Sequence, residues 1–196
     1  MTFRIIMAVV LGSVIGLFVP ESFYDMTDHL LTIGLCMLLF FVGIDIGKNK
    51  NVLNEIRKTG HLFFIIPIGV ALGSILGALA IGLALGYPIN ESGAIGSGFG
   101  WYTLSSIIIA PYSSELSVLA FLTNVVREVF AIALIPIVAK KLGFIEAIAP
   151  AGATAMDTTL PIISRNTNSE TAILSFSTGL ILSTLVPILV PLFLFR

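Results

Sequence analysis

Four polar residues interrupt an otherwise apolar stretch of the chain, in the run Thr123-Asn-Val-Val-Arg127-Glu128. In an α-helix, Asn124 and Glu128 lie one turn apart on the same face, while Arg127 points about 100° away from Glu128. An ionisable group at the centre of a bilayer costs about 2.5 to 3.5 kcal/mol on insertion scales, so such groups are functional candidates by default. A purely structural Arg127–Glu128 pair is the alternative, but adjacent side chains diverge, which favours a separate partner for each.

A second polar group lies in the run Gly152-Ala-Thr-Ala-Met-Asp157-Thr-Thr-Leu-Pro161. Pro161 suits the first turn of a new helix, and Asp157, Thr158 and Thr159 fill a break just before it. Asp157 could simply cap the new half-helix, but the threonines can supply that acceptor. We therefore expect Asp157 to bind an ion or a substrate, with Thr158 and Thr159 as hydroxyl ligands.

An earlier stretch offers a counterpart, Gly96-Ser-Gly-Phe-Gly100-Trp-Tyr-Thr-Leu-Ser105. Its segment 101–105 aligns weakly with 157–161, since both contain Thr-Leu at the same place. Glycines expose backbone amides, and the indole and the hydroxyls add side-chain ligands. The candidate ligands here are Trp101, Tyr102, Thr103 and Ser105, and the glycines expected to form the broken backbone are Gly98, Gly100 and Gly152.

The composition identifies the elements that must position these residues as membrane helices. Of 196 residues, 57% are hydrophobic and 11% are charged, about half the charged share of a soluble domain. A net charge of -1 gives no field that would attract nucleic acid. The single cysteine, Cys36, can form neither an intrachain disulfide nor a cysteine cluster, so we expect no metal site and no cofactor. The class is an all-α integral membrane protein.

Five apolar runs are long enough to cross a bilayer, which takes roughly 20 apolar residues in a helix. The predicted spans lie near 3–19, 29–47, 61–86, 115–139 and 170–194. The loops between them are too short to bury a core of their own. We therefore expect 1–196 to form a single transmembrane domain.

Two further stretches, 92–113 and 147–165, are apolar but too rich in Gly, Ser, Thr and Pro to be simple helices. Basic residues crowd the loop 48–58 and the end of the fourth span, which places both in the cytoplasm under the positive-inside rule. The amino terminus is then cytoplasmic and the carboxy terminus outside. With this topology the two stretches are re-entrant from opposite sides and point at each other, although one could be a kinked full span. Such matched broken helices indicate an inverted-repeat transporter with its site near mid-membrane.

Four motifs, in this order, resemble the LysO-type lysine exporters of bacteria and archaea. They are Ser97-Gly-Phe-Gly-Trp-Tyr-Thr-Leu-Ser105, Arg127-Glu128, the run 152–161 and Leu182-Ser-Thr-Leu-Val-Pro-Ile-Leu-Val190. The resemblance runs from about residue 29 to the end of the chain. It implies export of L-lysine, and of toxic lysine analogues, across the prokaryotic plasma membrane. It also implies membrane-embedded acidic residues, which match Glu128 and Asp157.

The chain departs from typical members of that family at its amino terminus, where they carry a few additional spans. The resemblance therefore implies a short or split exporter. A site built from interrupted backbone needs protein on every side, because lipid cannot satisfy its amides. We expect a homodimer, or a complex with a small membrane protein that supplies further spans.

The structure of lysine suggests a mechanism. Glu128 and Asp157 could hold its two ammonium groups, and Arg127 or the amides of a half-helix could bind its carboxylate. Protonation of a carboxylate would weaken its hold on the cation, which favours proton-coupled antiport, with sodium coupling as the alternative.

Other classes fit the sequence less well or stay open. An intramembrane aspartyl protease needs a second buried aspartate facing Asp157, and a serine protease needs a buried base, whereas His29 and His61 lie at membrane edges. We therefore expect no enzyme. Another cation or amino-acid transporter, a channel, or a structural subunit of a split transporter stays an alternative.

Overall fold

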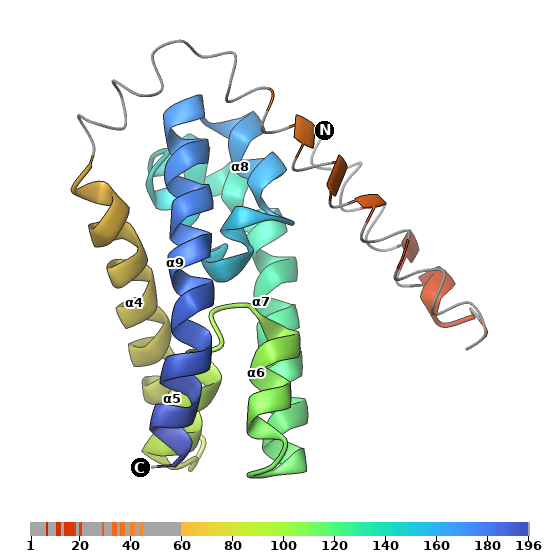
Figure 1. The fold of residues 1–196 in the computed structure, drawn as a ribbon, viewed down its shortest axis with the longest axis vertical. Helices are drawn as coiled ribbons and strands as arrows, with labels where there is room; N and C mark the ends of the chain where they lie inside the picture. Colours follow the sequence, from red (N-terminus) through yellow and green to blue (C-terminus); the bar gives the residue numbers. More distant parts are fainter. Residues whose placement is uncertain are drawn as a thin grey trace.

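The computed structural model describes residues 60–195 without a gap, and only scattered positions between residues 7 and 44. In the described part of the chain every regular element is a helix, as predicted. The predicted spans near 3–19 and 29–47 fall where most residues lie outside the description. Figure 1 shows the continuous part as an upright helical bundle.

Three long helices run the length of this bundle (Figure 1): α4 (Leu62–Ala84), α7 (Ser114–Lys141) and α9 (Ser169–Leu194). Their lengths and apolar compositions suffice to cross a membrane. They coincide closely with the predicted spans 61–86, 115–139 and 170–194. The chain is therefore an integral membrane protein.

Local signals explain where these helices begin and end. The hydroxyl oxygen of Ser113 accepts a hydrogen bond from Leu116 N (3.2 Å) and so caps α7, which has Glu115 in its first turn. Two lysines occupy the last turn of α7, where a cation is favoured by the helix dipole. Asn168 caps α9 in the same way, accepting from Thr171 N at 2.8 Å.

Both stretches predicted to be broken are interrupted in the structure. The first forms α5 (Ile89–Gly96) and α6 (Tyr102–Ile109), separated by residues 97–101. The second forms the 3₁₀ helices η2 (Glu146–Ile148) and η3 (Gly152–Met156), followed by α8 (Leu160–Asn166) with Pro161 in its first turn, as expected. In Figure 1, α5 and α6 lie toward one end of the bundle and α8 lies toward the other. That the two are re-entrant from opposite sides of a membrane stays a prediction.

The two interruptions, residues 97–101 and 152–159, are in contact inside the bundle. The backbone N–H of Ala153 donates to the carbonyl oxygen of Phe99 at 2.8 Å. Phe99 and Gly152 both have left-handed backbones, with φ of 50° and 64°. A Cβ at position 152 would collide with the Phe99 carbonyl oxygen, so glycine is required there by its conformation and by the close approach.

Small residues on α9 pack closely against η3. A Cβ at Gly179 would lie 2.5 Å from Met156 N, and Ser175 Oγ donates to Ala155 O at 2.7 Å. These contacts anchor η3 against α9. In contrast, Cβ atoms at Gly69, Gly73 and Gly77 on α4 would meet no atom of the described chain within 4 Å. No described residue therefore covers that face of α4.

Candidate functional site

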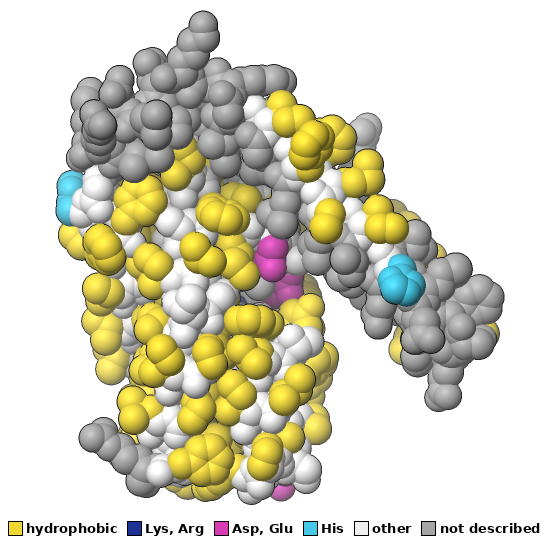
Figure 2. Space-filling model, in the orientation of Figure 1, with side chains coloured by type: hydrophobic (Ala, Val, Ile, Leu, Met, Phe, Trp, Pro, Cys, Tyr) yellow, Lys and Arg dark blue, Asp and Glu magenta, His cyan; other side chains and the backbone are white. Residues whose placement is uncertain are grey.

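A cavity of about 230 Å³ lies where the two interruptions meet α7. Most of the predicted site residues line it: Gly100, Trp101, Tyr102, Thr103, Glu128, Asp157 and Thr158. Both carboxylate residues are half-buried. Figure 2 shows acidic side chains at mid-height on a face of the bundle that hydrophobic side chains otherwise cover. The structure thus brings the two predicted acidic residues into one polar pocket.

Thr158 connects the two carboxylates. Its hydroxyl donates a hydrogen bond to Glu128 Oε1 and lies 3.4 Å from Asp157 Oδ1, while its backbone N–H donates to the same Asp157 oxygen at 2.6 Å. A hydroxyl carries one proton, so it donates fully to one carboxylate at a time. Acceptor capacity is left over on both residues. The arrangement suits a cation with several donors.

Asp157 is not the cap of α8. The residue at the capping position is Thr159, and no side chain caps that helix. Thr159 is fully buried, and its hydroxyl donates to Thr154 O at 2.8 Å, so it holds the break together from inside. Of the predicted hydroxyl ligands in this segment, Thr158 lines the cavity and Thr159 stabilises the backbone.

The wall of the cavity that belongs to α6 is aromatic. Trp101 precedes the helix and is 37% exposed, while the ring of Tyr102 meets the edge of Phe121 with 5.3 Å between ring centroids. Because α6 begins at Tyr102, its amino end lies at the cavity. Ser105 is fully buried, and its hydroxyl donates to Tyr102 O at 3.3 Å, so it faces the helix rather than the cavity.

Asn124 holds the first interruption in place. Its Oδ1 accepts from Gly100 N at 2.7 Å, and its Nδ2 donates to Ala120 O at 2.9 Å. A Cβ at Gly98 would lie 2.6 Å from that Nδ2, so the glycine lets the amide reach the backbone. Asn124 is 3% exposed and its side chain is committed to these contacts. It fixes the broken backbone and does not line the acidic cavity.

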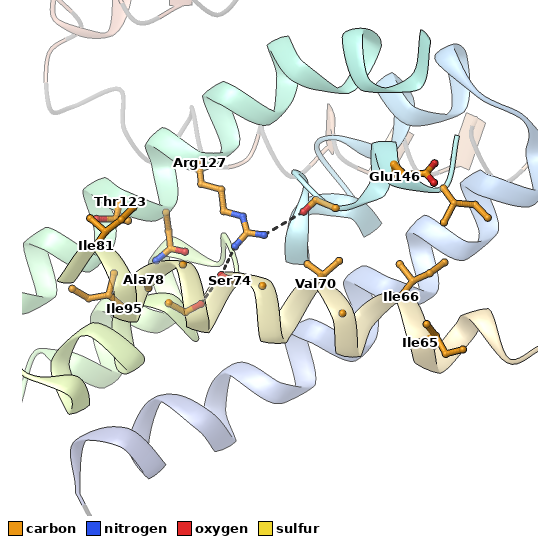
Figure 3. A pocket seen from close by; sticks show the side chains of 17 residues that line it. Ile65, Ile66, Val70, Ser74, Ala78, Ile81, Ile95, Thr123, Arg127 and Glu146 are labelled. Atoms are coloured by element: carbon orange, nitrogen blue, oxygen red, sulfur yellow. Dashed lines mark hydrogen bonds between the residues drawn. The ribbon is translucent and has the colours of Figure 1, made fainter. Parts of the chain in front are cut away.

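Arg127 does not line the cavity that contains Glu128 and Asp157. Its guanidinium donates to Ser74 Oγ at 2.7 Å, to Pro150 O at 3.3 Å and to Ala149 O at 3.4 Å. Figure 3 shows it reaching from α7 toward α4, in a separate hollow of about 630 Å³. The prediction that Arg127 and Glu128 find different partners is confirmed.

Sequence reasoning missed several residues of these two regions. Ser74 on α4 binds Arg127, and Met156 and Ser183 line the acidic cavity, where Ser183 Oγ lies 3.7 Å from the Met156 sulfur. A serine in an apolar helix looks like any other small packing residue. Ser175, Gly179 and Ser183 recur at intervals of four residues in α9, and this spacing is the one sequence pattern that marks Ser183.

The fold and the cavity together define an all-helical membrane protein in which two interrupted helices present a pair of carboxylates. The chain belongs to the lysine exporter LysO family, whose model matches residues 6–194. It is a family of exporters and not of enzymes.

Two relatives show the extent of the similarity. The lysine exporter LysO of Escherichia coli (strain K12) is 35% identical over 188 residues, which are 94% of this chain and 61% of that protein. A putative lysine exporter of Haemophilus influenzae is 32% identical over 193 residues, 97% of this chain and 96% of that protein. The chain thus spans 61% of the length of the E. coli relative. No solved structure matches it.

Proposed function

We propose that this protein exports L-lysine from the cytoplasm and that the acidic cavity binds the substrate. The observation that carries the proposal is the pair Glu128 and Asp157, joined through one threonine hydroxyl inside a bundle of membrane helices. Paired carboxylates at membrane depth select for a cation. Lysine carries two ammonium groups, and the names of the relatives describe its export.

In this proposal an ammonium group of lysine takes over the bridging position of the Thr158 hydroxyl. An ammonium has three donors, so it can bind both carboxylates at once, which the hydroxyl cannot. The substrate carboxylate then meets the amino end of α6 beside Trp101 and Tyr102, where backbone amides favour an anion. Toxic lysine analogues that keep this ammonium group and the carboxylate would bind in the same way.

Substitution of the carboxylates tests the site. We expect Glu128→Gln and Asp157→Asn to lower lysine flux in proteoliposomes roughly 10- to 150-fold, since a hydrogen bond to a charged group contributes about 1.5 to 3 kcal/mol. Both changes keep the side-chain shape. Glu115→Gln is the matched control, because Glu115 is an exposed residue of the same helix. Normal flux in folded Glu128→Gln protein would refute the site.

Proton-coupled antiport is the proposed energy source, because a proton bound to either carboxylate removes the charge that holds the ammonium. Sodium coupling is the alternative. Proteoliposomes loaded with lysine distinguish them: a pH gradient alone, with sodium absent, should drive net lysine movement against its own gradient. Movement only with a sodium gradient would replace the proton with sodium, and no uphill movement at all would indicate a channel.

The proposed orientation places the amino terminus and the end of α7 in the cytoplasm, and the end of α4 and the carboxy terminus outside. Two exposed leucines mark the two ends, Leu85 after α4 (70% exposed) and Leu142 after α7 (73% exposed). With Cys36 replaced by serine, Leu85→Cys should react with an impermeant maleimide from outside whole cells, and Leu142→Cys only after lysis. Labelling of both from outside would overturn this topology.

We also propose that the working unit contains more than one chain, either as a homodimer or with a small membrane protein. Acidic side chains are visible from the side of the bundle at mid-height (Figure 2), and contact of a carboxylate with lipid costs free energy. Native mass spectrometry in mild detergent, combined with reconstituted flux, tests this, and a transport-active monomer would contradict it.

A further inference from the structure

The guanidinium of Arg127 connects three separate parts of the fold. It is carried by α7, it donates to the hydroxyl of Ser74 on α4, and it donates to the carbonyl oxygens of Ala149 and Pro150. These two carbonyls follow η2 and stand just before Gly152, where the second interruption begins. Carbonyl groups at the end of a helical turn lack helical partners and are natural acceptors for a cation.

Ser74 extends this connection to the first interruption. Its hydroxyl accepts from Arg127 Nη1 at 2.7 Å and donates to Gly96 O at 2.8 Å. Gly96 is the last residue of α5, directly before the first interruption. Figure 3 shows the arginine and the serine facing each other between α7 and α4. Arg127 therefore binds the second interruption directly and the first through one hydroxyl.

The guanidinium also lies directly behind the point where the two interruptions touch. A Cβ on Gly152 would meet the Phe99 carbonyl oxygen and, at 2.8 Å, Arg127 Nη2. The acidic cavity contains Gly100, Ala153 and Thr154 of the same two interruptions but does not contain Arg127. The two backbones in contact thus separate the guanidinium from the cavity. In this position Arg127 does not contact the carboxylate of a substrate bound there.

We propose that Arg127 and Ser74 form a clamp that positions the two interruptions, and hence the residues of the acidic cavity, and that Arg127 does not bind the substrate. Asn124, one turn earlier on α7, adds its bond to Gly100 N on the same side. The proposal deepens the lysine site proposed above and rests on it for its transport readout. Its geometric part concerns this chain alone.

The clamp depends on the shape of arginine. A planar guanidinium donates in several fixed directions at once, here to a hydroxyl and to two carbonyls, whereas an ammonium is a compact point charge on a flexible stem. We therefore expect Arg127→Lys to keep the charge and lose the clamp. Ser74→Ala should remove only the link to Gly96, while Ser74→Thr keeps the hydroxyl and should restore the link.

The only tryptophan of the chain reports on the clamp independently of transport. Trp101 lines the acidic cavity and follows the first interruption, so its fluorescence emission senses the position of that segment. We expect Ser74→Ala and Arg127→Lys to shift the emission maximum, and Ser74→Thr to return it toward that of the unmodified protein. Gly73→Ala is the matched control, because a Cβ beside Ser74 meets no atom within 4 Å. Unchanged emission in both Ser74→Ala and Arg127→Lys would overturn the clamp.

The binding of two ligands then distinguishes a positioning role of Arg127 from direct contact with the substrate. Cadaverine is lysine without its carboxylate, so a residue that binds the carboxylate affects lysine alone. A clamp predicts that Arg127→Lys lowers lysine and cadaverine binding by the same factor, and that Ser74→Ala, which loses one ordinary hydrogen bond to Gly96, lowers both about fivefold. Loss of lysine binding with cadaverine binding intact would make Arg127 a substrate ligand and refute the proposal. If the variants shift the emission but the unmodified protein neither binds nor transports lysine, the clamp is supported and the proposed function is refuted.

Discussion

Two neighbouring residues of α7, Arg127 and Glu128, line different cavities and have different kinds of neighbours. Glu128 faces a small cavity, where a single hydroxyl serves both it and Asp157. Arg127 faces the hollow beside α4, where three of its five N–H donors are bound to a serine and two backbone carbonyls. Glu128 keeps unused acceptors, whereas most donors of Arg127 are bound within the chain.

Unused hydrogen-bonding capacity distinguishes a ligand-binding residue from a structural one better than its charge or its depth in the membrane does. Both residues lie in the middle of a membrane helix, and both carry the cost of an ionisable group there. What distinguishes them is the capacity left for a ligand. On that criterion we assign Glu128 to the proposed site and Arg127 to the framework that holds it.

The largest effect is expected from a substitution that forces apart the two interruptions, which separate Arg127 from the acidic cavity. Gly152→Ala places a Cβ against the Phe99 carbonyl oxygen and puts alanine at a φ of 64°, which alone costs about 1 to 2 kcal/mol. We expect a clear fall in the melting temperature in detergent and loss of lysine flux. Gly77→Ala should instead raise the melting temperature, because a Cβ there meets no described atom within 4 Å and alanine favours a helix by about 0.5 to 1 kcal/mol. Equal melting temperatures for the two variants would show that the contact between interruptions is unimportant.

A weaker perturbation tests the hydroxyl that joins the carboxylates. Thr158→Val keeps the shape of the side chain and removes its hydrogen bonds to Glu128 and Asp157. Since a typical hydrogen bond contributes about 1 kcal/mol, we expect roughly a fivefold change in the apparent affinity for lysine. Thr158→Ser restores the hydroxyl and should restore the affinity. Identical affinities for the valine and serine variants would exclude the hydroxyl from the site.

The sequence predicts the long helices and the acidic pair well, because both depend on strong local signals. Apolar length predicts α4, α7 and α9 to within a few residues, and the cost of burying a carboxylate singles out Glu128. Helical periodicity also predicts that Arg127 turns away from Glu128. The break at Asp157 follows from the proline and the threonines around it.

The partners of Arg127 and Asn124 could not be predicted in this way. Each binds a residue distant in sequence, Ser74 in one case and the Gly100 amide in the other, through an ordinary serine or a backbone group that leaves no local pattern. Asn124 shares a helical face with Glu128, so periodicity placed it in the same pocket. Its side chain is taken up instead by the backbone of the first interruption, which a helical pattern does not represent.

Cysteine labelling compares lysine access to the acidic cavity with lysine access to the α4 hollow, without altering either carboxylate. Thr103 is an exposed residue of the acidic cavity, and Gly73 is an exposed residue of the α4 hollow. In a protein with Cys36 replaced by serine, lysine should slow maleimide labelling of Thr103→Cys and leave that of Gly73→Cys unchanged. If bound lysine blocks the thiol, the labelling rate falls by the factor 1 + [L]/Kd, which is about fivefold at a lysine concentration four times Kd. Protection at Gly73→Cys alone would move the substrate to the side of Arg127, and with it would reverse the roles that we assign to the two residues.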